Sequence, residues 1–207
     1  LSSSSAASDV YKRQEISGGR YQAFSSIIEF VPRVTISLIP EGFYNNGTLR
    51  MRDTVSIFVR NSEKPYNLVD SESVIIDSLD FHVTPVLDVN PFNDYYVVVK
   101  HRNTLETWSV VTSLNNYNYN FTTAANQAYG DNQVLIASNP KQYAVYSGDV
   151  NQDGFIDLKD GLIIYGDVVN YETGYVNTDL TGDKIVDLSD LYLGYNNILN
   201  QVSIQRP

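Results

Sequence analysis

The chain has 207 residues, a net charge of −10 and no cysteine. The missing cysteines exclude thiol catalysis and cysteine-ligated zinc or iron–sulfur sites, and the acidic balance argues against nucleic acid as a partner. The sequence has no apolar run of about 18 residues, the length that a membrane-spanning helix needs, so no membrane span is predicted.

Residues 1–14, "LSSSSAASDVYKRQ", resemble the translated read-through of a sequencing adapter, a contaminant of environmental short-read assemblies. The alternative is a serine-rich, disordered leader. On the adapter interpretation these residues do not belong to the natural protein, and any natural export signal is missing.

Residues 15–32 contain a β-prone, apolar segment behind a Gly-Gly pair, "GGRYQAFSSIIEFVPR". One interpretation is the first strand of the following domain. The other is a donor strand, formed by residues 20–31, that completes the sandwich of a neighbouring subunit, as in bacterial pilus-like fibres. Its two alternating faces would carry Tyr21, Ala23, Ser25 and Ile27, or Phe24, Ser26, Ile28 and Phe30.

Residues 33–147 alternate in the manner of β-strands. "VTISLI" places Val34, Ile36 and Leu38 on one face, and "TVSIFVR" does the same with Val55, Ile57 and Val59. Short runs separated by turn clusters such as "NNG" and "NPFND" predict an antiparallel β-sandwich. The pattern resembles the immunoglobulin-like and transthyretin-like sandwiches of secreted bacterial proteins.

No catalytic constellation is visible in these residues, so we expect no enzyme. His82 and His101 are expected in core or surface roles, and the pairs Asp70–Glu72 and Asp77–Asp80 in solvated turns. An aromatic platform for a sugar is an alternative to core packing for one group of side chains. That group is Trp108 with Tyr95, Tyr96, Tyr117 and Tyr119.

The character of the sequence changes near Ser147. Residues 148–207 hold ten acidic and three basic side chains, so most of the net charge lies here, and they contain a repeat with a spacing of 30. The acidic side chains of "GDVNQDGFIDLKD" recur at this spacing in a second loop. Because like charges this close repel, the repeat predicts a bound cation.

Calcium takes six to eight oxygens, which a 12-residue loop supplies from positions 1, 3, 5, 7, 9 and 12. The first predicted site is Asp149, Asn151, Asp153, the carbonyl of Phe155, Asp157 and Asp160; the second is Asp179, Thr181, Asp183, the carbonyl of Ile185, Asp187 and Asp190. Gly154 stands at position 6, where a positive φ is needed, but Lys184 stands there in the second loop. Since Thr181 is also a weak ligand, the second site should bind calcium more weakly.

A helical period follows each loop. Two stacked loop–helix units are expected to bury an apolar stripe each, and Ile156 and Val186, at position 8, are expected to pair between the loops. The stripes are Leu158, Leu162, Tyr165 and Val169, and Leu188, Leu191, Tyr195, Ile198 and Val202.

Residues 148–207 resemble the dockerin family in their two calcium-loop and helix repeats, with aspartate at position 12. The resemblance implies a small helical, calcium-binding domain. Dockerins dock onto cohesin modules, often through a Ser-Thr-like pair at positions 10 and 11. Here these positions hold Leu158–Lys159 and Leu188–Ser189, so the partner does not carry over.

The sequence thus predicts a mainly β protein: an antiparallel immunoglobulin-like β-sandwich at 33–147, then a small α-helical dockerin-like domain with two Ca²⁺ loops at 148–207. Two functions are consistent with it. One is a secreted structural subunit that polymerises with copies of itself into an extracellular or cell-surface filament. The other is a carbohydrate- or cohesin-binding module of a secreted bacterial protein.

Overall fold

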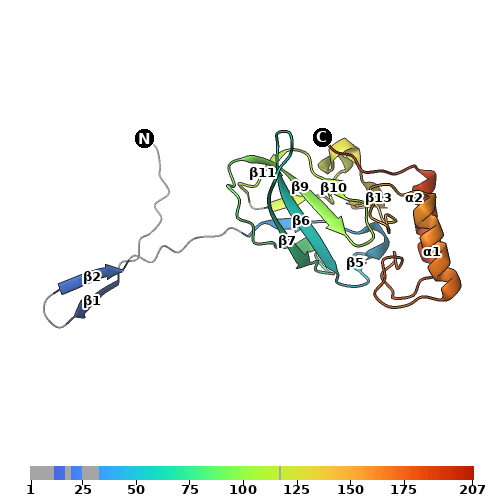
Figure 1. The fold of residues 1–207 in the computed structure, drawn as a ribbon, viewed down its shortest axis with the longest axis horizontal. Helices are drawn as coiled ribbons and strands as arrows, with labels where there is room; N and C mark the ends of the chain where they lie inside the picture. Colours follow the sequence, from blue (N-terminus) through green and yellow to red (C-terminus); the bar gives the residue numbers. More distant parts are fainter. Residues whose placement is uncertain (1–11, 17–19, 25–32, 117) are drawn as a thin grey trace. The chain divides into compact units, whose positions relative to one another are not determined.

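The computed structural model describes residues 12–16, 20–24, 33–116 and 118–207 (Figure 1). It divides into two compact units, Leu1–Val31 and Pro32–Pro207. The protein is mainly β, with several antiparallel sheets and two α-helices, as the sequence predicts.

The described residues of the first unit form a pair of strands. Strand β1 (Lys12–Ile16) pairs antiparallel with β2 (Arg20–Phe24), and Gln14 lies opposite Gln22. The predicted donor strand spans residues 20–31: its first part forms β2, whereas residues 25–31 lie outside the described residues. Of the adapter-like residues 1–14, only 12–14 are described, within β1.

Residues 33–147, here called the β region, contain two main sheets. The larger has the order β10-β9-β6-β7, with β11 also paired to β9, and all its pairs are antiparallel. The smaller has the order β12-β3-β8, in which β12 runs parallel to β3. Their strands are β3 (Thr35–Ser37), β6 (Thr54–Asn61), β7 (Leu68–Ile75), β8 (His82–Val83), β9 (Asp94–His101), β10 (Thr107–Trp108), β11 (Thr112–Ser113) and β12 (Asn118–Asn120).

Two small hairpins and three short 3-10 helices complete the β region. The hairpins are β4 (Tyr44–Asn45) with β5 (Thr48–Leu49) and β13 (Val134–Ser138) with β14 (Lys141–Ala144); the 3-10 helices are η1 (Glu41–Phe43), η2 (Ala125–Gln127) and η3 (Tyr129–Asp131).

One hydrophobic core lies between the two main sheets. The predicted inward faces are confirmed, because Val34, Ile36 and Leu38, and likewise Val55, Ile57 and Val59, are fully buried. Val97 and Val99 of β9 and Val83 of β8 pack into the same core. Alternation along β6 therefore places one side chain in two against the opposite sheet, as expected for stacked sheets.

The prediction of solvated turns is wrong for one acidic pair. Asp70 and Glu72 lie in β7, where Asp70 Oδ2 accepts a hydrogen bond from the Asp88 amide at 2.7 Å and Glu72 accepts one from the Val86 amide. These carboxylates satisfy the backbone of the neighbouring segment, a role that no local pattern shows. Asp77 does stabilise a turn, since its Oδ1 accepts from the Leu79 amide at 2.8 Å.

Helices α1 (Leu158–Asn170) and α2 (Leu188–Leu199) lie side by side at one end of the second unit (Figure 1). Residues 148–207, here called the helical region, belong to the same compact unit as the β region. Hydrogen bonds join the two across the predicted boundary: the Gly148 amide donates to the Asn103 carbonyl at 2.7 Å, and Asn197 Nδ2 donates to the Ser147 carbonyl at 2.8 Å.

Glu41 of the β region lies at the boundary between the two regions, here called the joint. Its Oε2 accepts hydrogen bonds from the Ser147 amide at 3.0 Å and from Asn197 Nδ2 at 2.6 Å. Burial raises the pKa of Glu41, although these two hydrogen bonds oppose the rise. Hydrogen bonds of largely buried groups therefore join the two regions, in addition to the apolar contacts of Leu105 with Ile156 and Val202, so we expect the two regions to unfold together.

A substitution at Gly42 tests how closely the two regions pack at the joint. A Cβ at Gly42 would lie 2.1 Å from the Leu180 carbonyl oxygen, which belongs to the second acidic loop. Because a backbone atom blocks the added methyl group, Gly42→Ala should lower the free energy of unfolding by about 2–3 kcal/mol.

Gly166→Ala is the matched control, because it adds the same methyl group in α1 where nothing lies within 4 Å. It should raise stability by about 0.5–1 kcal/mol through helix propensity. Urea denaturation followed by circular dichroism measures both, and equal effects of the two substitutions would contradict the tight joint.

Candidate calcium-binding loops

The position-12 carboxylate closes each loop onto its own helix. In the first loop, Asp160 Oδ1 accepts hydrogen bonds from the amides of Val150 (3.0 Å) and Asn151 (3.2 Å), and Oδ2 accepts from the Asp157 amide at 3.0 Å. Asp157 is the N-cap of α1 and accepts from the Lys159 amide at 2.7 Å, which completes a capping box.

The second loop repeats this arrangement. Asp190 Oδ1 accepts from the Thr181 amide at 2.8 Å, and its Oδ2 accepts from the Asp187 amide at 2.9 Å. Asp187 caps α2 through the Ser189 amide. Both Asp160 and Asp190 are fully buried. The 30-residue repeat in the sequence thus corresponds to a repeated loop geometry.

Asp149 carries a buried oxygen that accepts no hydrogen bond from any residue in the described part of the chain. Its Oδ2 accepts a hydrogen bond from the Gly154 amide at 3.1 Å, whereas Oδ1 is buried and no hydrogen bond to it is formed within the described residues. The residue is only 2% exposed. Burial raises the pKa of Asp149 to about 6; the Gly154 amide opposes this, and the neighbouring charges of Asp160 and Asp153 add to it. A cation bound to Oδ1 would relieve both penalties.

The second loop has an equivalent feature. Thr181 Oγ1, at position 3, is buried and makes no hydrogen bond within the part of the chain that the structure describes. Asp179, at position 1, is fully buried. Its Oδ1 accepts from the Gly182 amide at 2.8 Å and its Oδ2 from the Lys184 amide at 3.2 Å. Buried oxygen atoms in both loops fit an oxygen-ligated cation such as Ca²⁺.

The remaining predicted ligands lie at the rims of the loops. Their carboxylate and amide oxygens accept hydrogen bonds from backbone amides two residues later, as Asn151 does from Asp153 and Asp183 does from Ile185. Among the described residues, no three His, Asp or Glu groups converge into a metal-ligating cluster. A calcium ion here would need the amide, hydroxyl and carbonyl oxygens of Asn151, Thr181, Phe155 and Ile185 as well.

Position 6 requires a left-handed backbone in both loops. Gly154 has φ 89° and Lys184 has φ 70°, which confirms the conformation predicted from the glycine. Gln152 also has a positive φ, 60°, and its Nε2 donates to the Asp149 carbonyl at 2.6 Å and to the Thr104 carbonyl at 3.2 Å. No local pattern in the sequence indicates this link between the first loop and the β region.

The expected pairing of Ile156 with Val186 is wrong. Both side chains are buried, but the Ile156 amide donates to the Val202 carbonyl at 2.9 Å, after α2. The Val186 amide donates to the Glu172 carbonyl at 2.9 Å, after α1. Each loop therefore pairs with the segment that follows the other helix.

The predicted burial is wrong for the first helical stripe and holds for part of the second. Leu158, Leu162, Tyr165 and Val169 are exposed, and so are Leu188 and Tyr195, with the additional Tyr192 and Leu199. Val202 is buried, and Leu191 and Ile198 are partly buried and pack against apolar clusters. The capping geometry explains the exposed side chains. Asp160 must face the loop, and at about 100° per residue Leu158 and Leu162 lie about 200° from it. The helices instead touch through Gly161 and Gly194, where an added Cβ would lie 2.9 Å from Ile198 and Ile164, respectively.

The described aromatic side chains of the candidate sugar platform are buried and do not form an exposed surface. Trp108, Tyr95, Tyr96 and Tyr119 are at most 6% exposed, and Tyr117 lies outside the described residues. Trp108 packs edge-on against Tyr96 and donates from Nε1 to Glu106 at 2.8 Å. The core alternative therefore holds for these four side chains. His101 is buried too, with Nε2 3.0 Å from Asp53 Oδ2.

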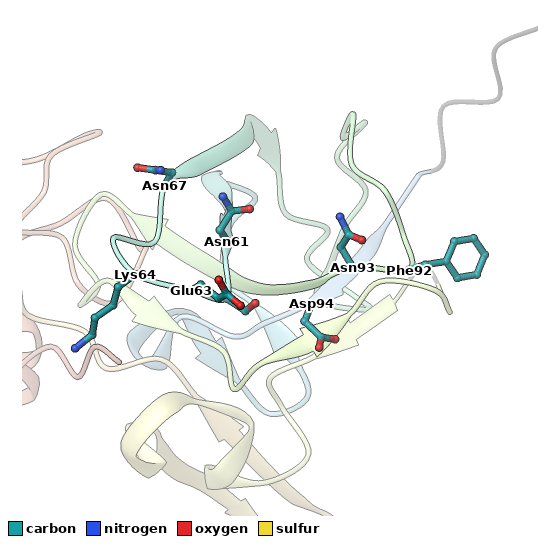
Figure 2. Close-up of a pocket in the computed structure, with 8 residues that line it drawn as sticks. Asn61, Glu63, Lys64, Asn67, Phe92, Asn93 and Asp94 are labelled. Atoms are coloured by element: carbon teal, nitrogen blue, oxygen red, sulfur yellow. The ribbon is translucent and has the colours of Figure 1, made fainter.

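A polar hollow opens elsewhere on the β region, between the turns at 61–67 and 92–94 (Figure 2). Asn61, Asn67, Asn93 and Asp94 offer amide and carboxylate groups there, while the Phe92 ring points away and is 81% exposed. Nothing in this hollow forms an acid–base pair or a nucleophilic dyad among its lining residues. Its amides could hydrogen-bond a polar ligand such as a sugar.

Comparison with protein-family models and with curated proteins gives no match for this chain. Among the described residues, the helices are too short or too polar to cross a membrane.

Lys184 offers a test of the loop geometry. Its φ of 70° is strained for a side chain with a Cβ. Lys184→Gly should therefore be more stable than Lys184→Ala by about 1 kcal/mol, since both remove the charge but only glycine relieves the strain. Thermal unfolding in excess chelator measures the difference, and equal stabilities would contradict a left-handed position 6.

Proposed function

We propose that this protein is a secreted calcium-binding structural subunit, built from an immunoglobulin-like sandwich and a dockerin-like helical domain. The observation that carries the proposal is the buried, unpartnered Oδ1 of Asp149 in a loop that repeats 30 residues later. Four acidic side chains per loop, with two of them buried, need a counter-charge, and a divalent cation supplies it.

A structural role for the metal follows from the position of the loops. Gly148 and Val176, which precede Asp149 and Asp179 in the chain, form hydrogen bonds with the β region. The Asp179 carbonyl also accepts a hydrogen bond from Asn103 Nδ2 at 2.8 Å. An ion at either loop would thus brace the joint between the two regions. Because calcium binds the folded loops and not the unfolded chain, it would stabilise the whole unit by linkage.

Calcium titration tests this proposal. We expect isothermal titration calorimetry of the calcium-stripped protein to show two binding events, the weaker from the loop that contains Thr181. Asp149→Asn should weaken the stronger event by about a hundredfold, because a neutral amide replaces the buried carboxylate. Calcium should also raise the melting temperature of residues 32–207 as a single transition.

Asp94→Asn is the matched control, because it removes the same charge from an exposed site in β9 outside both loops. It should leave both binding events unchanged. A folded wild-type protein that gives no heat with calcium would sink the proposal.

We propose that assembly proceeds through residues 20–31, which leave their own subunit and complete a sheet of a neighbour. What supports this is the β-prone composition of the segment and the extended strand that residues 20–24 form. In the monomer this strand pairs with β1, so exchange would replace one antiparallel partner by another. Because each subunit both donates and accepts, the contact would propagate into a filament.

Deletion of residues 15–31 tests the assembly. The full chain should form filaments in negative-stain micrographs, whereas the deletion variant should not, and an added peptide of residues 20–31 should bind to it. A full chain that remains monomeric at high concentration, by light scattering, would rule out donor-strand assembly without affecting the calcium proposal.

A second candidate function has one observation in its favour. The outward faces of α1 and α2 present leucine, tyrosine and valine side chains that are all more than half exposed. Exposed apolar side chains gathered on two neighbouring helices are typical of interaction sites. A module of a larger secreted protein that docks onto a cohesin-like receptor would use this face. Monomers that fail to polymerise would favour this second function.

A further inference from the structure

The two loops differ in the cations that surround them. In the first loop, the ion pairs formed within the described residues come from its own Lys159, which is 71% exposed and contacts Asp153 at 3.3 Å. In the second loop, two arginines arrive from the β region. Arg102 Nη2 lies 3.5 Å from Asp179 Oδ2, and Arg50 Nη1 lies 3.4 Å from Asp183 Oδ2.

Arg102 is the buried one of these two arginines. Its side chain is 9% exposed and that of Asp179 is fully buried, whereas Arg50 and Asp183 are partly solvated. Salt and water screen the outer pair but not the inner one. Arg102 therefore places a positive charge beside the position-1 ligand of the second loop.

The guanidinium of Arg102 is held in place from several sides. Nε donates to Asp53 Oδ2 at 2.8 Å, and Nη1 donates to the Val176 carbonyl. The guanidinium lies 4.6 Å from the ring centre of Tyr175 and 5.4 Å from that of Phe43. A planar cation stacked and hydrogen-bonded in this way cannot swing into solvent when another cation arrives.

Asp53 is itself fixed as an anion. Burial would raise the pKa of Asp53, but contacts with His101, Tyr175 and Arg102 outweigh burial and hold it well below the usual range. The Tyr175 hydroxyl donates to Asp53 Oδ1 at 2.6 Å. Asp53 therefore anchors Arg102 from the β region, and Tyr175 connects this anchor to the helical region.

We propose that Arg102 is a built-in cation of the second loop, which stabilises that loop without calcium and weakens calcium binding to it. The inference rests on the proposed calcium function. Arg102 neutralises part of the charge on Asp179, and it repels a divalent ion that would share this carboxylate. The first loop has no such buried cation among the described residues, so its folding should depend more on calcium.

Arg102 could instead serve only to attach the β region to the loop, without affecting calcium. The two roles predict opposite changes in calcium affinity when Arg102 is replaced. Loss of a purely structural contact would loosen the loop and weaken calcium binding, whereas loss of a competing charge would strengthen it. Calcium affinity at the second loop therefore distinguishes them.

The experiment is a calcium titration followed by NMR, with the Gly154 amide as reporter of the first loop and the Gly182 amide as reporter of the second. Arg102→Met should tighten calcium binding at Gly182 by about tenfold, the effect of a nearby unit charge at high effective dielectric. Binding at Gly154 should change little. The same variant should lose melting temperature in chelator and recover most of it in saturating calcium.

Arg60→Met is the matched control, because Arg60 is another arginine of the β region, but it stacks over Trp108, 5.5 Å from its ring centre. It should leave both affinities unchanged. Arg50→Met should tighten the second loop by less than about threefold, because its ion pair is solvent-screened. If Arg102→Met does not fold, the double variant with Asp53→Asn replaces it, because Asp53 would otherwise remain as a buried carboxylate without its arginine. The double variant should also bind calcium more tightly at the second loop.

An unchanged or weakened affinity at Gly182 in Arg102→Met would overturn the inference, and so would a double variant that stays unfolded in saturating calcium. A second loop that binds no calcium in either wild type or variant would overturn it as well. If neither Gly154 nor Gly182 responds to calcium in the wild type, the calcium function itself fails, and the two failures are thus distinguishable.

Discussion

The structure of the helical region depends on one interaction, the hydrogen bonding of a buried aspartate at the start of each helix to the amides of the preceding loop. Asp160 and Asp190 each satisfy amides at the beginning of their loop and the amide of the helix N-cap. This closes the loop, caps the helix and fixes the rotation of the helix about its axis. The direction of every other side chain on α1 and α2 follows from that rotation.

The hydrogen bonds of Asp160 and Asp190 also decide which face of each helix is buried and which is exposed. Because the aspartates point inward, the positions near them become the contact face, and this face carries glycines that let the helices approach closely. The larger apolar side chains are turned outward. These apolar side chains are the ones that would contact a partner in the second function proposed above.

The joint between the β region and the helical region combines an apolar cluster, in which Leu105 packs with Ile156 and Val202, with a network of buried polar groups. Glu41, Asp53 and Arg102 lie in it, and each contacts partners from both regions. Buried polar networks of this kind fix one orientation, since any shift leaves a charge unpaired. The joint therefore couples the acidic loops to the sheets, so that an ion bound at the loops, as we propose, would stabilise the whole unit.

The sequence by itself determined the local features: alternating strands such as Val55 to Val59, the two acidic loops with their helices, and the left-handed position occupied by Gly154 and Lys184. These depend on side-chain period and backbone sterics, which neighbouring residues encode. Only the tertiary structure decided which face of each helix is buried, that Ile156 pairs with Val202, and that Arg102 reaches Asp179. Those outcomes depend on contacts between residues far apart in the chain, whose energies no local pattern contains.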